Sequence, residues 1–214
     1  SARGPDRREI LRRGLMAIGG VAVGGAAFRI GVCDARVTPE KGLLAPDANG
    51  LRLPPGFESR VVARSSRPPV PGRPYRWHGA PDGGATFAAP DGGWVYVSNS
   101  EQHAGQGGCG ALRFDSRGTL VDAYSILSGT TSNCAGGPTP WGTWFSCEEF
   151  AEGRVWECDP FGKRPAEVRP ALGVFNHEAA AVDLKRGCIY LTEDEPDGLL
   201  YRFTPARPAK GGRM

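Results

Sequence analysis

Short segments of alternating apolar and polar residues recur along the second half of the chain. In each, an aromatic residue precedes an apolar residue, a hydroxyl side chain and then an acid, at 96–101, 144–149 and 190–195. The aromatic residues are 48 and 46 residues apart. Alternation over a few residues is typical of half-buried strands, so the sequence predicts a repeated all-β unit of about 45 residues.

Two further segments accompany each aromatic strand. One follows it, at 112–115, 156–159 and 201–204, and one that is rich in small residues precedes it, at 84–87, 133–136 and 176–180. A repeat of this length made of short strands is typical of a β-propeller blade, whose first strand lines the axis. We therefore expect an all-β fold, a β-propeller. A β-sandwich is the alternative, although it does not require a repeat at this interval.

Glycine and proline strengthen the expectation of short strands. The 214 residues include 32 glycines and 19 prolines, which favour many turns and disfavour long helices. Only about three repeats fit after Pro81, whereas closed propellers have four to eight blades. We therefore expect a truncated chain that binds metal weakly, turns over little substrate and self-associates through unpaired blade edges.

Basic residues are concentrated at the N-terminus. Arg7 and Arg8 form a twin-arginine pair ahead of residues 14–28, which carry no charge. This order is typical of a signal read by the twin-arginine export machinery, and it predicts a periplasmic or extracellular protein. The uncharged stretch is shorter than the roughly 20 residues that span a bilayer. A membrane anchor, a buried helix and lipid attachment at Cys33 are the alternatives.

The sequence thus predicts four regions. These are a signal segment at 1–35, a lead-in rich in proline and arginine at 36–80, a partial propeller at 81–205 and a basic irregular tail at 206–214. The net charge of +3 arises from residues 1–30, which carry +4, so the remaining residues carry −1. Nucleic-acid binding needs a clustered basic face, and we expect no nucleic-acid partner.

Acidic residues recur at one phase of the repeat. Glu101, Glu148 and the run 193–195 end the aromatic strands, while Cys134 and Glu178 lie in the preceding segments that would face the axis. Carboxylates held close together repel one another unless cations neutralise them. Oxygen ligands suit Ca²⁺ or Mg²⁺, and a thiolate among them suits a transition metal such as iron. The alternative is that these acids only solubilise the turns.

One segment resembles a known family. Residues 133–144 read NCAGGPTPWGTW, and Cys147-Glu148-Glu149 follows closely. This run resembles the signature of the PhoX family of secreted alkaline phosphatases, and segments 175–181 and 190–194 extend the similarity. The resemblance implies a β-propeller with iron and calcium at its centre. It also implies hydrolysis of small phosphate esters by a metal-bound oxygen nucleophile, with no catalytic side chain assigned.

The resemblance further implies a set of metal ligands. Cys134 corresponds to an iron ligand, and the remaining positions are carboxylates. Those expected in the same cluster are Glu101, Glu178 and Asp194, and those expected to serve iron or calcium are Glu148, Glu149 and Glu193. One departure concerns Ser100, because the family usually has a histidine directly before this acid, whereas His103 here lies two residues beyond it.

Two other functions remain open from the sequence. A calcium-dependent lactonase-type propeller hydrolase shares the central acids but uses no cysteine ligand, and a non-catalytic propeller module would bind calcium for stability alone. The metal bound through Cys134 distinguishes these alternatives from the phosphatase. The six cysteines show no C-x-x-C spacing, which argues against a zinc ribbon, and no G-x-x-x-x-G-K phosphate loop is present.

Overall fold

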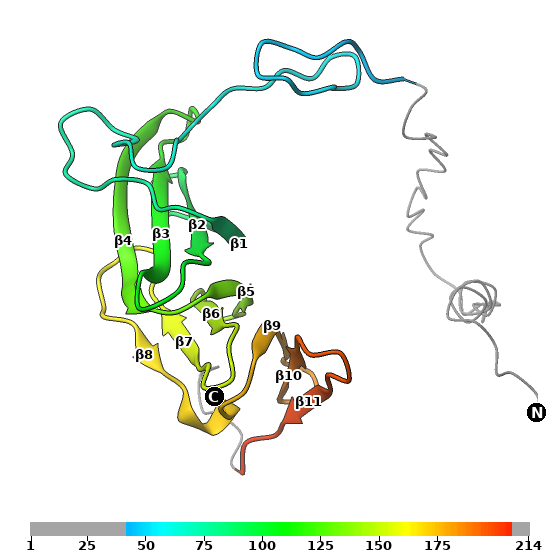
Figure 1. Cartoon of the computed structure of the whole chain (residues 1–214). Coiled ribbons are helices and arrows are strands. Elements are labelled where there is room, and N and C mark those ends of the chain that lie inside the picture. Colours follow the sequence, from blue (N-terminus) through cyan, green and yellow to red (C-terminus); the bar gives the residue numbers. More distant parts are fainter. Residues whose placement is uncertain (1–41, 207–214) are drawn as a thin grey trace, which may run out of the picture. The chain divides into compact units, whose positions relative to one another are not determined.

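A computed structural model describes residues 42–206 of the chain (Figure 1). The predicted signal segment at 1–35, with Arg7, Arg8 and Cys33, lies outside the described residues, as does nearly all of the tail at 206–214. The described residues divide into two units, one that ends at Phe57 and one that begins at Glu58. In the described part of the chain, no helix has the length and apolar character needed to cross a membrane.

The described residues of the second unit form three antiparallel sheets in which strands adjacent in sequence are neighbours. The first sheet contains β1 (Pro81–Ala88), β2 (Trp94–Ser100), β3 (Gly107–Phe114) and β4 (Leu120–Thr130). The second contains β5 (Asn133–Pro138), β6 (Trp144–Glu148), β7 (Val155–Cys158) and β8 (Glu167–Val168). A 3₁₀ turn at Pro170–Leu172 leads to the third sheet, with β9 (His177–Asp183), β10 (Cys188–Glu193) and β11 (Leu200–Phe203). The prediction of an all-β fold built from repeated short strands is confirmed.

The first strand of each sheet is an edge strand, and β5 lies next to both β1 and β9 (Figure 1). Glycine permits this close approach. A Cβ at Gly83 of β1 would lie 2.7 Å from Ala135 Cα in β5, and a Cβ at Gly137 of β5 would lie 1.8 Å from the Ala180 carbonyl oxygen in β9. The small residues noted in the sequence therefore bring three backbones together at one place.

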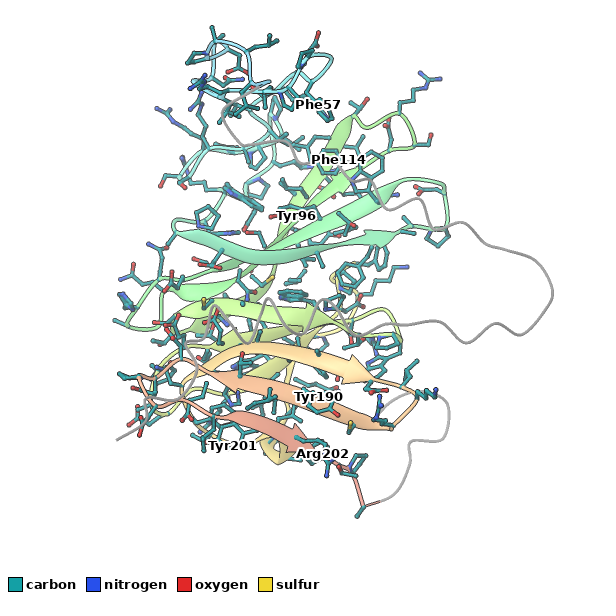
Figure 2. The ribbon with its side chains drawn as sticks, turned by 90° about the vertical axis from the view of Figure 1, so that its right-hand side faces the viewer. Phe57, Tyr96, Phe114, Tyr190, Tyr201 and Arg202 are labelled. Carbon is teal, nitrogen blue, oxygen red and sulfur yellow. The ribbon has the colours of Figure 1, made fainter. Side chains whose placement is uncertain are left out.

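Alternating side chains of the first sheet enter two different cores. Val95 and Val97 of β2 pack with Trp144 of the second sheet, whereas Trp94 and Tyr96 pack on the opposite face. That opposite core includes Leu112 and Phe114 of β3 and residues of the lead-in, namely Val62, Ala63, Val70, Tyr75 and Trp77. Figure 2 shows the side chains of Tyr96 and Phe114 on these strands. Part of the lead-in thus packs against the sheet and covers one of its faces.

Candidate metal centre

Each sheet begins with the same irregular hairpin. The first paired residues are Pro81 with Ser100, Asn133 with Glu148, and His177 with Glu193. Regular pairing resumes at Gly84 with Ser98, Gly136 with Ser146, and Ala180 with Leu191. Between these pairs, two residues of the first strand oppose one residue of the second. Such a β-bulge bends the strand and redirects its side chains, and it occurs here at the same place three times.

The three hairpins place chemically active side chains at two equivalent positions. The first residue of each bulge is Asp82, Cys134 or Glu178, and the residue directly after each second strand is Glu101, Glu149 or Asp194. The backbone holds the second position in the same way each time. Its N–H donates to the carbonyl oxygen of Ala80, Ser132 or Asn176, at 2.9, 2.8 and 3.1 Å respectively. Because the first strands are neighbours, these positions converge.

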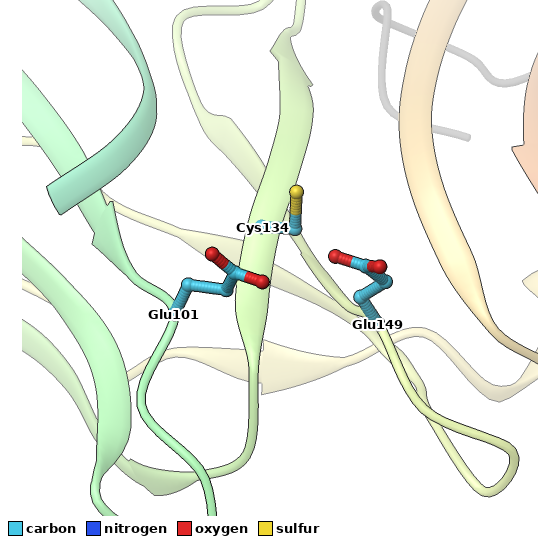
Figure 3. A group of neighbouring side chains, drawn as sticks. All are labelled: Glu101, Cys134 and Glu149. Atoms are coloured by element: carbon cyan, nitrogen blue, oxygen red, sulfur yellow. The ribbon is translucent and has the colours of Figure 1, made fainter. Parts of the chain in front are cut away.

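Two overlapping groups of side chains result. One ligand atom from each of Glu101, Cys134 and Glu149 lies within 4.8 Å of the others, and the same holds for Glu149, Glu178 and Asp194. Figure 3 shows the carboxylates of Glu101 and Glu149 on either side of the Cys134 thiol. The thiol also donates a hydrogen bond to Glu178 Oε2 at 3.4 Å. Side chains from all three sheets therefore meet around Cys134 and Glu149.

The electrostatics of this site disfavour negative charge. Burial raises the pKa of Glu149, and a hydrogen bond with Asp194 and the charges of Glu178 and Glu101 raise it further, partly opposed by the bond from Cys134. Burial is also the main cause that raises the pKa of Cys134, followed by Glu149 and Glu178. A bound cation would reverse these effects by favouring the charged forms of its ligands.

The donor set fits such cations. Four carboxylates and one thiol lie within reach of a pair of sites, which suits a hard cation in one group and a softer transition metal in the other. A further acceptor is free nearby. Asn176 Oδ1 is buried and without a hydrogen-bond partner, while its Nδ2 donates to the Asp194 carbonyl at 2.7 Å.

Comparison with known proteins identifies the family. Residues 99–214, just over half of the chain, match the family model described as alkaline phosphatase PhoX. The chain belongs to the PhoX family. The resemblance found in the sequence is therefore confirmed, and the match includes both groups of candidate ligands. A comparison with curated proteins found no significant match.

Two of the ligands that the PhoX resemblance implied, Glu148 and Glu193, belong to neither group in the described part of the chain. Glu148 accepts hydrogen bonds from Thr131 N at 2.8 Å, Arg154 N at 3.2 Å and Trp156 Nε1 at 3.0 Å, and its side chain is buried. Glu193 Oε2 accepts from Leu199 N and the Tyr201 hydroxyl, both at 3.1 Å. Each glutamate thus orders the loop beside its own strand. His103, two residues beyond Glu101, lies 2.7 Å from Ser132 Oγ.

Asp82 is a candidate that the sequence reasoning missed. It occupies the bulge position that Cys134 and Glu178 occupy in the other hairpins, and its charge contributes to the raised pKa of Cys134. The sequence alignment instead began the first segment at residue 84. The acid after the second strand lies 19 residues beyond this position in the first hairpin but 15 and 16 residues beyond it in the other two, so an alignment at a fixed interval misses Asp82.

Proposed function

We propose that this PhoX-family chain acts in the hydrolysis of phosphate monoesters, with iron and calcium held by the two overlapping side-chain groups. The family match supports the reaction class. The observation that carries the proposal is that the Cys134 thiol lies within 4.8 Å of the Glu101 and Glu149 carboxylates and 3.4 Å from Glu178 Oε2, so that carboxylates from three sheets surround it. If these acids only solubilised the turns, they would not need to converge, and no thiol would be needed among them.

We further propose that the three sheets are blades of a β-propeller. The support is that β1, β5 and β9 are adjacent edge strands with matching bulges, while the later strands of each sheet lie progressively farther from them (Figure 1). In a propeller, the first strands line the axis and present their side chains to a common centre. Export through the twin-arginine pair, Arg7 and Arg8, remains part of the proposal.

The chemistry of the donor atoms indicates which metal each of the two groups would hold. Glu101, Cys134 and Glu149 would hold iron, because a thiolate prefers a softer transition metal. Glu149, Glu178 and Asp194 would hold calcium, because they offer only oxygen donors. Bound metals would supply Lewis-acid polarisation of the phosphoryl group and neutralise charge in the transition state.

The backbone of the chain holds the candidate ligands in position. The backbone bonds from the N–H groups of Glu101, Glu149 and Asp194 fix the loops that carry these acids, and the bulges fix Cys134 and Glu178. Glu149 belongs to both groups, so its carboxylate sets the spacing between them. Such preorganisation lets the site bind a phosphate ester without rearranging its own ligands.

Metal binding to Cys134→Ala tests the proposal. We expect the wild-type protein to take up iron and calcium during equilibrium dialysis and the variant to lose iron while retaining calcium. Cys188→Ala is the matched control, because Cys188 is also buried but belongs to neither group. The hydrolysis of p-nitrophenyl phosphate, which we expect to be slow in the wild-type protein, should fall together with iron. Iron retained by a folded Cys134→Ala protein would refute the ligand assignment, and calcium uptake without iron by the wild type would favour a lactonase-type or non-catalytic propeller.

A further inference from the structure

The bulge that carries Cys134 leaves backbone groups outside the strand ladder. Cys134 and Ala135 of β5 together oppose Cys147 of β6, and regular pairing resumes at Gly136. Residues within a bulge need other hydrogen-bond partners when they are buried. Here one side chain of the neighbouring sheet supplies them. Asn99 Nδ2 donates to the Cys134 carbonyl oxygen at 2.9 Å and to the Ala135 carbonyl oxygen at 2.7 Å.

Two donors on the other side fix the orientation of the Asn99 amide. Its Oδ1 accepts hydrogen bonds from Trp144 Nε1 at 2.9 Å and from Ser146 Oγ at 2.8 Å. An indole N–H can only donate, so the amide oxygen must face Trp144 and the NH₂ group must face the bulge. Asn99 has no solvent exposure, and both its donors and its acceptor are used. Its side chain is therefore held in one arrangement.

The other two described hairpins do not repeat this contact. The residue that opposes the bulge is Cys147 in the second hairpin and Thr192 in the third. Cys147 enters the apolar core formed with the third sheet, and Thr192 Oγ1 accepts a bond from Ala179 N of its own hairpin. An amide that reaches across to the next sheet thus occurs at the one bulge whose first residue is a cysteine.

We propose that Asn99 is a positioning residue for Cys134, because its amide holds the bulge that directs the thiol toward Glu101 and Glu149. The inference rests on the proposed role of Cys134 as a metal ligand. Asn99 acts through the backbone of Cys134 and Ala135. Residues that orient a metal ligand typically change metal affinity by about 10–100-fold when they are replaced.

Cobalt(II) titration of the chelator-treated full chain tests this role. A cobalt–thiolate bond gives a charge-transfer absorption that reports directly on Cys134, independently of turnover. Asn99→Leu removes both donors at similar volume, and we expect it to weaken Co²⁺ binding about 10–100-fold and to diminish the charge-transfer band. Ser146→Ala is the matched control. It removes one bond to Asn99 Oδ1 and the acceptor of Asn133 Nδ2, but it leaves both bonds from Asn99 to the bulge, so its band should match the wild type.

The outcomes separate this inference from the proposed function. A wild-type protein without the thiolate band overturns the ligand role of Cys134, and the positioning role falls with it. A wild-type band together with an unchanged band and affinity in folded Asn99→Leu overturns only the positioning role. Should Asn99→Leu not fold, NMR of the wild-type protein decides the geometry. We expect slow solvent exchange of the Asn99 side-chain amide protons, and exchange as fast as in exposed amides would contradict the proposal.

Discussion

At the scale of single residues, His78 makes the stability of the folded protein depend on pH. Its Nδ1 lies 3.1 Å from the Tyr75 hydroxyl, its Nε2 lies 3.3 Å from Ser98 Oγ, and its ring lies 4.2 Å from the Trp77 ring between centroids. Burial lowers the pKa of His78 from 6.5 to about 4. The folded protein therefore keeps this imidazole neutral at pH values where the unfolded chain is protonated.

We predict that this difference destabilises the protein in mild acid. The unfolded state binds the extra proton between about pH 6.5 and 4, so the free energy of unfolding should fall as the pH falls through this window. His78→Gln keeps a polar side chain and cannot titrate. This substitution should reduce the loss of unfolding free energy between pH 7 and pH 4.5 by about 1–2 kcal/mol, because the partial exposure of His78 weakens the contribution of its pKa shift. Urea unfolding of both proteins in the presence of a chelator, at pH 7 and pH 4.5, measures this difference. An equal loss of unfolding free energy in the two proteins would contradict the prediction.

The candidate ligands show how far residues can be predicted from the sequence. Glu101, Cys134, Glu149, Glu178 and Asp194 were all expected at the site, and the structure groups them. Glu148 and Glu193 were expected as well, because the resemblance to the PhoX family implied them, and the alignment of the repeats on their aromatic residues did not exclude them. That alignment is one residue out of step in the third hairpin, where Ile189, not Tyr190, corresponds to Trp144. A shift of one residue in a strand exchanges its two faces, and the sequence pattern does not reveal it.

At the scale of elements, the site depends on how closely β5 approaches β9. Gly137 makes that approach possible, because a Cβ there would lie 1.8 Å from the Ala180 carbonyl oxygen. The backbone conformation of Gly137 is not left-handed, so only the approach requires glycine. The two strands carry Cys134 and Glu178, whose side chains are in hydrogen-bond contact. Separating the strands would therefore disturb both the stability of the fold and the group formed by Glu149, Glu178 and Asp194.

We predict that Gly137→Ala destabilises the protein by about 2–3 kcal/mol, because backbone must move to admit the methyl group. Gly187→Ala is the control. Gly187 has a φ of 62° with nothing within 4 Å of its Cβ position, so alanine there should cost only about 1 kcal/mol of conformational strain. Thermal unfolding compares the two, and calcium titration should show weaker binding for Gly137→Ala alone. Equal effects of the two substitutions on both measurements would refute this account of the β5–β9 contact.

Some strands were predicted from the alternation of apolar and polar residues, and others were not. The alternating segments at 96–101 and 144–149 overlap β2 and β6, because one face of each strand is apolar. β4 was not predicted, although it is 11 residues long, because nothing in the later repeats matches it. The bulges also lay beyond prediction, since they depend on backbone pairing between strands. They nevertheless determine which side chains reach the site.

At the scale of the second unit, the outer strands leave apolar surface at an edge. β11 pairs with β10 on one side and has no partner strand on the other among the described residues. Leu200 of β11 is 69% exposed and Leu199, directly before it, is 58% exposed. An exposed apolar edge with unpaired backbone groups can pair with another chain. We therefore propose that the protein self-associates through β11.

Leu200→Lys tests self-association of the whole molecule. Lysine on an edge strand disfavours pairing between chains, because the charge would be buried against the partner strand. We expect the wild type to show concentration-dependent association in sedimentation velocity and Leu200→Lys to remain monomeric at the same concentrations. Leu184→Lys is the matched control, because Leu184 is 58% exposed and lies in the turn between β9 and β10. Association lost equally in both variants would indicate general surface hydrophobicity, and a monomeric wild type would show that this edge does not pair.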